Sequence, residues 1–145
     1  MDTKNTKHNI QQTAPFFMVS NMEKSLAFYT TKLGYTMTNK WVPRGRIEWC
    51  WLQRESAAIM LQEHGNNSEL VNQKKGAGVC ICYQCEDALA LYHEFLEKEI
   101  SALPEPFVGN NLWVVEVIDP DGYKLFFESK TDVPEETTYS AWKQH

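Results

Sequence analysis

The chain has 145 residues, 43% of them hydrophobic and 12% aromatic, which is enough apolar material for one domain with a real core. Its 14 Lys and Arg residues against 19 Asp and Glu residues give a net charge of −5, which argues against nucleic-acid binding. No stretch approaches the roughly 18 apolar residues of a membrane span. We expect a cytoplasmic protein whose four cysteines are reduced thiols.

The first half of the chain predicts one strand, one helix and three strands. Residues 1–12 form a polar tail, and the apolar run at 14–19 suits a buried strand. Ser20 and Glu23 fit a helix-capping box, apolar residues then recur at helical spacing, and Gly34 suits the end of the helix. Three β-rich runs follow, at 35–42, 47–52 and 57–63.

The second half repeats this order after a polar linker at 64–75. A strand at 79–84 precedes Glu86 and Asp87, two acidic residues that suit a helix start, and an apolar helical face follows. The turn Asp119-Pro120-Asp121-Gly122 fits type I geometry. Three further strands are expected near 101–103, at 112–118 and at 123–128.

These elements predict a single domain at 13–129, made of two βαβββ modules at 13–63 and 76–129. The C-terminal segment at 130–145 is a polar tail, except for Tyr139 and Trp142. Those two aromatic residues are expected to pack either on the domain or on a partner.

Two motifs carry a resemblance to a known superfamily. The run Asn21-Met22-Glu23-Lys24-Ser25-Leu26-Ala27-Phe28-Tyr29, followed by Leu33-Gly34-Tyr35, resembles the first helix and exit turn of the glyoxalase, bleomycin-resistance and extradiol-dioxygenase (vicinal oxygen chelate) superfamily. Asp119-Pro120-Asp121-Gly122-Tyr123 resembles its last turn. The resemblance implies an α+β fold in which the mixed sheets of two tandem modules form a shared cleft.

In the metal-using members of this superfamily, four strand residues bind a divalent ion. The resemblance places these positions at Ala14 and Met60 in the first half and at Cys80 and Phe126 in the second. Each pair is 46 residues apart (60 minus 14, and 126 minus 80), so the duplication is in register. None of the four is an oxygen or imidazole donor of the kind such a cation requires. We therefore expect no metal and no other cofactor.

One alternative metal site stays open. A shift of two residues along each strand keeps the same strand face and selects Phe16, Gln62, Cys82 and Glu128, a poorer set that still allows ion binding. A zinc site around Cys80, Cys82 and Cys85 lacks a fourth ligand, so we expect these thiols in the core.

Aromatic and acidic residues on the predicted strands supply candidate ligand-binding residues. Tryptophans would stack on a ligand, apolar residues that face inward by the resemblance would form walls, and a glutamate would bind a cationic group. The alternatives are that the tryptophans fill the core and that the glutamates face solvent. The candidate set is Phe16, Glu48, Trp49, Trp51, Met60, Trp113, Glu116 and Phe126.

The first functional hypothesis is a metal-free protein that resembles bleomycin-resistance proteins and sequesters a flat or cationic small molecule in an aromatic cleft. In such binders two subunits share each pocket, and Pro15 is placed to direct the preceding arm onto a partner. The rival is an enzyme, a glyoxalase-like lyase or isomerase or a dioxygenase, with a displaced metal site or carboxylate acid–base chemistry. A third option is an interaction domain whose own aromatic residues fill the cavity.

Overall fold

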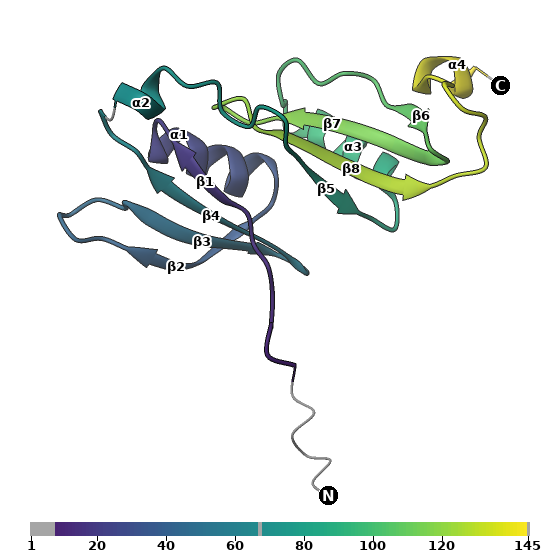
Figure 1. The fold of residues 1–145 in the computed structure, drawn as a ribbon. Coiled ribbons are helices and arrows are strands. Elements are labelled where there is room, and N and C mark those ends of the chain that lie inside the picture. Colours follow the sequence, from purple (N-terminus) through teal and green to yellow (C-terminus); the bar gives the residue numbers. More distant parts are fainter. Residues whose placement is uncertain (1–7, 67, 145) are drawn as a thin grey trace, which may run out of the picture.

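A computed structural model describes residues 8–66 and 68–144, so most of the predicted N-terminal tail (1–7 of 1–12) lies outside the described residues. The chain forms two four-stranded sheets, each with a helix on one side (Figure 1). In chain order the elements are β1 (Phe16–Val19), α1 (Met22–Ala27), η2 (Phe28–Lys32), β2 (Thr36–Trp41), β3 (Trp49–Arg54), β4 (Ala57–Glu63), α2 (Ser68–Val71), β5 (Cys80–Gln84), α3 (Ala88–Glu97), β6 (Phe107–Gly109), β7 (Leu112–Ile118), β8 (Lys124–Lys130) and α4 (Tyr139–Lys143).

The two sheets have the same topology. Sheet A has the order β1-β4-β3-β2 and sheet B the order β5-β8-β7-β6. The pairs β1–β4 and β5–β8 are parallel, and the others are antiparallel. Phe16 pairs with Met60 and Cys82 with Phe126, an offset of 66 residues in both cases (82 minus 16, and 126 minus 60). The predicted α+β fold of two tandem βαβββ modules is therefore confirmed.

The two main helices begin at side-chain caps. Asn21, rather than the predicted Ser20, caps α1, and its Oδ1 accepts a hydrogen bond of 3.0 Å from the Lys24 amide. The Ser20 amide instead binds Asp121 at 3.0 Å, which explains the difference. Asp87 caps α3 in the same way as Asn21 caps α1. Gly34 follows the π-helical turn η2 with φ of +77°, the left-handed conformation expected at a helix end.

The predicted edge strand at 101–103 is wrong. This segment is a turn in which Ala102 has φ of 53°, a backbone conformation that a strand excludes. Pro104 and Pro106 follow, and proline lacks the amide that a strand pair uses. The edge strand β6 begins only at Phe107. The other strands begin and end within two residues of the predicted positions.

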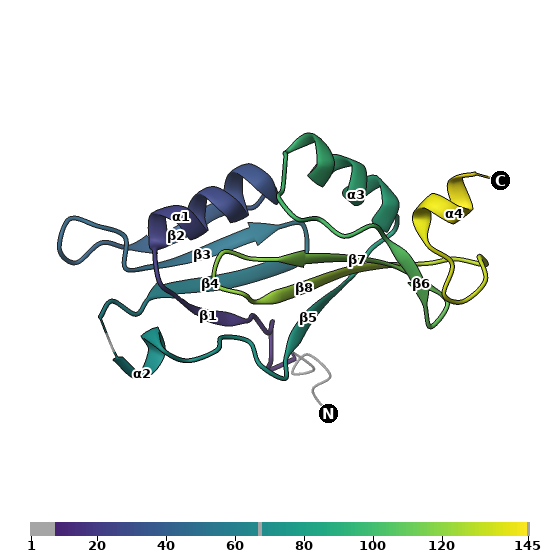
Figure 2. The same ribbon diagram turned by 90° about the horizontal axis from the view of Figure 1, so that it is seen from above.

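The core lies between the sheets and their helices, and it continues across the two modules. Figure 2 shows α1 and α3 on the same side of the two sheets. The Phe17 ring stacks on Tyr123 with centroids 3.9 Å apart. The buried Tyr29 hydroxyl donates to Asp119 at 2.7 Å. Burial raises the pKa of both Tyr29 and Asp119. The modules are therefore joined through their helix-facing sides.

The C-terminal segment packs on the domain, which decides between the two alternatives. Trp142 lies 5.4 Å from Trp113 between ring centroids, and Tyr139 lies 6.3 Å from Trp113. The Tyr139 hydroxyl also shares a hydrogen bond of 3.1 Å with His93 on α3. None of the helices among the described residues has the length and apolar character that a bilayer crossing needs.

Candidate functional site

The side of sheet A that faces away from α1 is lined with aromatic and thioether side chains. Along β3 the buried Cys50 and Leu52 alternate with half-buried Trp49 and Trp51, so the tryptophans lie on the outer side. The strand register sets Trp51 opposite Met60, and Met60 opposite Phe16. We call this surface the aromatic face. Its aromatic and thioether members are Phe16, Met18, Trp41, Trp49, Trp51 and Met60, and the amide side chains of Asn39 and Gln62 lie among them.

The equivalent side of sheet B is chemically different. Where sheet A has Phe16, Met60 and Trp51 in one row, sheet B has Cys82, Phe126 and Glu116. We call this surface the mixed face. Its members are Cys80, Cys82, Gln84, Phe107, Leu112, Val114, Glu116, Ile118, Lys124, Phe126, Glu128 and Lys130.

Two of the predicted ligand-binding residues lie on neither face. Trp113 is only 4% exposed and packs against Tyr139 and Trp142 on the helix-facing side of sheet B. Glu48 directly precedes Trp49, so strand alternation turns it to the opposite side. Its Oε1 accepts a hydrogen bond of 2.6 Å from Arg44. The predicted stack of three tryptophans therefore does not form within the chain.

The other six predicted residues divide between the two faces. Phe16, Trp49, Trp51 and Met60 come together on the aromatic face. Glu116 and Phe126 are register partners on the mixed face.

The thiols Cys80 and Cys82 are exposed, so their predicted place in the core is wrong. They lie on the mixed face along the edge strand β5, with their Sγ atoms 3.8 Å apart. Desolvation, with a smaller effect of the neighbouring Cys80, raises the pKa of Cys82 to about 11. That thiol is therefore protonated at neutral pH.

The residues at the metal positions do not fit a divalent cation. Ala14, Met60 and Phe126 offer no oxygen or nitrogen side-chain donor, and Cys80 is a soft one. Across residues 8–66 and 68–144, no three His, Cys, Asp or Glu side chains are grouped to hold a metal ion. In the alternative set, Glu128 accepts a hydrogen bond of 2.8 Å from Gln84.

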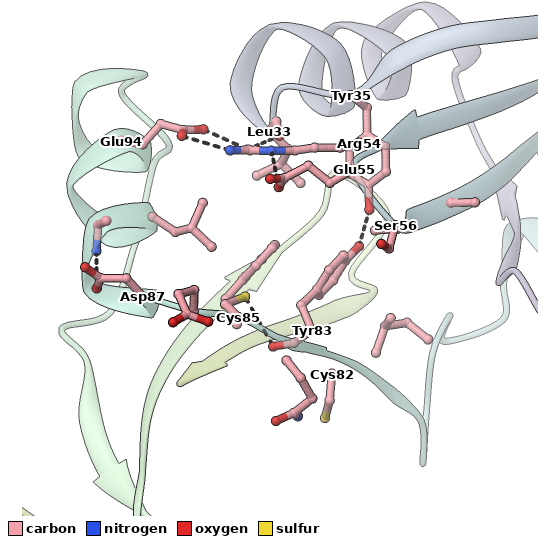
Figure 3. A pocket seen from close by; sticks show the side chains of 18 of the residues that line it. Leu33, Tyr35, Arg54, Glu55, Ser56, Cys82, Tyr83, Cys85, Asp87 and Glu94 are labelled. Atoms are coloured by element: carbon pink, nitrogen blue, oxygen red, sulfur yellow. Dashed lines mark hydrogen bonds and ion pairs between the residues drawn. The ribbon is translucent and has the colours of Figure 1, made fainter. Parts of the chain in front are cut away.

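A groove of about 730 Å³ opens between the two modules (Figure 3). One wall comes from the β3–β4 turn and the segment before β1, and the other from β5 and the first turns of α3. Arg54 crosses this boundary, and its two terminal nitrogens bind the Glu94 carboxylate at 2.8 and 3.0 Å. The Tyr35 and Tyr83 hydroxyls share a hydrogen bond of 2.6 Å at the inner end of the groove.

Several ionisable groups that line the groove have shifted pKa values. Burial raises the pKa of Tyr35 to about 12 and that of Tyr83 further still, and it also raises the pKa of Cys85. The hydrogen bonds to Glu94 raise the pKa of Arg54. At neutral pH the phenols and the thiol are therefore neutral, and the guanidinium is charged and paired.

No local sequence pattern predicted this groove. Arg54 ends β3, and Glu94 on α3 lies 40 residues further along the chain. Only the packing of one module on the other brings them into contact.

Two βαβββ modules with matching topology and exposed outer sheet faces define a glyoxalase-like protein. The chain belongs to the Glyoxalase/Bleomycin resistance protein/Dioxygenase superfamily, whose family model matches residues 9–127. The predicted resemblance is confirmed. No curated protein matches the sequence significantly.

Solved structures with a similar fold cover most of the chain. A bleomycin-binding protein complexed with bleomycin has a TM-score of 0.67 and 17% identity, over 84% of this chain and 100% of its own. TnmS3, an antibiotic binding protein from Streptomyces sp. CB03234, has a TM-score of 0.63 and 17% identity, over 86% and 100%. A glyoxylase/bleomycin resistance protein/dioxygenase domain from Frankia sp. EAN1pec has a TM-score of 0.68 and 15% identity, over 88% and 96%.

Proposed function

We propose that this protein is a metal-free binding protein that sequesters a flat, cationic small molecule. The ligand lies between the aromatic face of one copy and the mixed face of a second copy in a homodimer. One observation carries the proposal: the aromatic face gathers three tryptophans, Phe16 and Met60 on the side of sheet A that faces away from α1. Stacking on such side chains favours flat aromatic ligands.

The middle of the mixed face supplies a carboxylate for a cationic group, whereas Lys124 and Lys130 lie at the two ends of β8. Glu116 lies in the middle row beside Phe126, so a carboxylate adjoins an apolar contact. A cation held near this carboxylate gains more from it when a second protein surface excludes water. The residues at the metal positions provide no donors for a hard cation, which supports binding without a metal.

A homodimer accounts for the apolar residues that both faces leave open. Phe16 and Trp41 are 47% and 53% exposed on the aromatic face, and Phe107 and Ile118 are 41% and 50% exposed on the mixed face. A two-fold interface in which unlike faces meet would cover both at once. The arm at 8–15 leads away from the body of the chain (Figure 1), in position to reach a partner. Four free cysteines suit a reducing cytoplasm.

The similar structures support the choice of ligand class. Two of them are a complex with bleomycin and an antibiotic binding protein. Their identity to this chain is 17%, so they support binding of a small organic molecule without specifying which one.

The test is isothermal titration calorimetry with proflavine, a flat aromatic cation, and with anthracene-9-carboxylate, an anion with the same number of fused rings. We expect saturable binding of proflavine and much weaker binding of the anion. Trp51→Ala should weaken proflavine binding at least tenfold, because it removes a stacking surface. Trp142→Ala is the matched control, because Trp142 is 41% exposed but lies on neither face.

The metal content of the same purified sample provides a second readout. We expect well under one divalent ion per chain by mass spectrometry. About one tightly bound ion per chain, lost on mutation of Cys82 or Glu128, would contradict the metal-free proposal and favour the enzyme.

A further inference from the structure

We infer that the groove between the modules is a second, separate binding site, and that it takes an amphiphilic cation: an apolar chain or ring bearing one amine. This site lies within one chain and uses neither Trp49, Trp51 nor Met60. The groove borders the mixed face, because Cys82 and Gln84 belong to both, and Thr13 and Pro15 of the arm also line it. The variants below therefore separate this inference from the proposed function.

The size and shape of the groove suit a small organic molecule. Its volume of about 730 Å³ lies within the range of roughly 300–1,000 Å³ typical of ligand pockets. Its walls come from two modules joined by the Arg54–Glu94 pair and the Tyr35–Tyr83 hydrogen bond. The groove is therefore held open without a ligand, which reduces the entropy cost of binding.

The inner walls are apolar or neutral. Pro15 and Ala57 line one side, and Ile81 and Leu91 line the other. All four are half-buried, so a ligand chain would remove their remaining surface from water. The raised pKa of Tyr35, about 12, keeps the phenol at the inner end uncharged.

The charges at the rim are negative. Arg54 is the only basic residue among the described residues that line the groove, and Glu94 already neutralises it. Three exposed carboxylates add to the negative charge on both walls of the opening: Glu55, which lies 3.9 Å from the Arg54 Nε, Glu86, and Asp87, which also caps α3. A ligand with an apolar body in the groove and an ammonium group at the rim meets both requirements. An anionic ligand of the same shape is repelled.

The first experiment compares three probes by isothermal titration calorimetry: 4-phenylbutylamine, 4-phenylbutan-1-ol and 4-phenylbutanoate. They share one apolar body and differ only in the charge of the head group. We expect the amine to bind more tightly than the alcohol and the carboxylate not to bind. Equal binding of all three would overturn the assignment of a cationic ligand.

A steric variant locates the site. Ala90 lines the groove from an exposed position on α3, so Ala90→Trp fills the groove without disturbing the core. We expect it to weaken amine binding at least tenfold. Glu97→Trp is the matched control, because Glu97 is exposed on the same helix and does not line the groove.

Charge variants test the rim. Glu55→Gln and Glu86→Gln should each weaken amine binding by about twofold to fivefold, the effect of one exposed ion pair, and added salt should reduce this difference. Glu23→Gln, on the exposed part of α1, should leave binding unchanged.

The result for Trp51→Ala separates this inference from the proposed function. We expect this variant to bind 4-phenylbutylamine as well as the wild type does. If Trp51→Ala abolishes amine binding while Ala90→Trp leaves it intact, the amine binds the aromatic face and the inference is overturned. Absence of proflavine binding with normal amine binding would contradict only the proposed function.

Discussion

The two sides of each sheet contain similar residue types, but most residues on the helix-facing side are buried and most of those on the outer side are exposed or half-buried. Trp51 and Trp113 both lie on apolar strands, yet Trp51 is half-buried on an outer face and Trp113 is 4% exposed against Tyr139 and Trp142. Cys50 is fully buried, whereas Cys80 and Cys82 are exposed. The position of a residue in the strand alternation therefore decides whether it stabilises the fold or is available to a ligand.

The largest expected effect concerns the helix-facing side. Trp113→Ala should lower the free energy of unfolding by about 3–5 kcal/mol, because it leaves a cavity beside α4. Urea denaturation followed by circular dichroism measures this loss. Trp51→Ala is the comparison variant, and we expect it to cost well under half as much. Equal losses would show that the two sides do not differ as described.

Tyr29→Phe tests the polar contact that joins the modules. The variant removes the hydroxyl that donates to Asp119, so one oxygen of this buried carboxylate loses its hydrogen bond from Tyr29. We expect the free energy of unfolding to fall by about 1.5–3 kcal/mol. Gln62→Ala, on an outer strand position, is the control and should change stability little. Chemical denaturation of both variants at neutral pH is the measurement.

Because the Cys50 thiol is buried, we expect the stability of the fold to depend on pH. Burial raises its pKa from 9.0 to about 11, so the folded protein keeps a proton that the unfolded thiol releases. This contribution to stability is complete below pH 9 and is lost as the pH rises towards 11. The total loss is about 2–3 kcal/mol. Cys50→Val, which does not titrate, should show a smaller decline between these two pH values in the same denaturation experiment. An identical decline would contradict burial of this thiol.

The smallest effect concerns the rates at which the cysteines are alkylated. Iodoacetamide should label the exposed Cys80 in the folded protein, label Cys82 more slowly because its raised pKa leaves little thiolate, and leave the buried Cys50 unlabelled. Peptide mass spectrometry identifies the sites. In urea all of them should react. If Cys50 in the folded protein were labelled at the same rate as Cys80, the helix-facing side of the sheet would not be buried as described.

The repeated element order was predictable from the sequence, because apolar spacing and turn residues act locally. The equal separation of Ala14 from Met60 and of Cys80 from Phe126 anticipated that the two sheets have matching registers. The observed strand partners are shifted by two residues, because Met60 pairs with Phe16 and Phe126 pairs with Cys82. The edge strand β6 was misplaced because the positive φ at Ala102 leaves no mark in the sequence, although Pro104 and Pro106 already argue against a strand that continues through them.

The site was predictable only in part. The face of Trp49 and Trp51 follows from alternation along one strand, but the face of Trp113 depends on which side of sheet B packs against α3 and α4. The groove depends on contacts such as Arg54–Glu94 across 40 residues, and no local pattern encodes them. Long-range packing therefore limits what the sequence alone predicts.

The central claim is that each ligand lies between unlike faces of two copies, and mixing two inactive variants tests it directly. Trp51→Ala damages the aromatic face and Phe126→Ala damages the mixed face, so neither homodimer should bind proflavine. A mixed dimer has one doubly damaged site and one intact site. After unfolding and refolding an equal mixture, we predict that about a quarter of the wild-type sites return, because half of the dimers are mixed. Recovery of no sites would contradict the account.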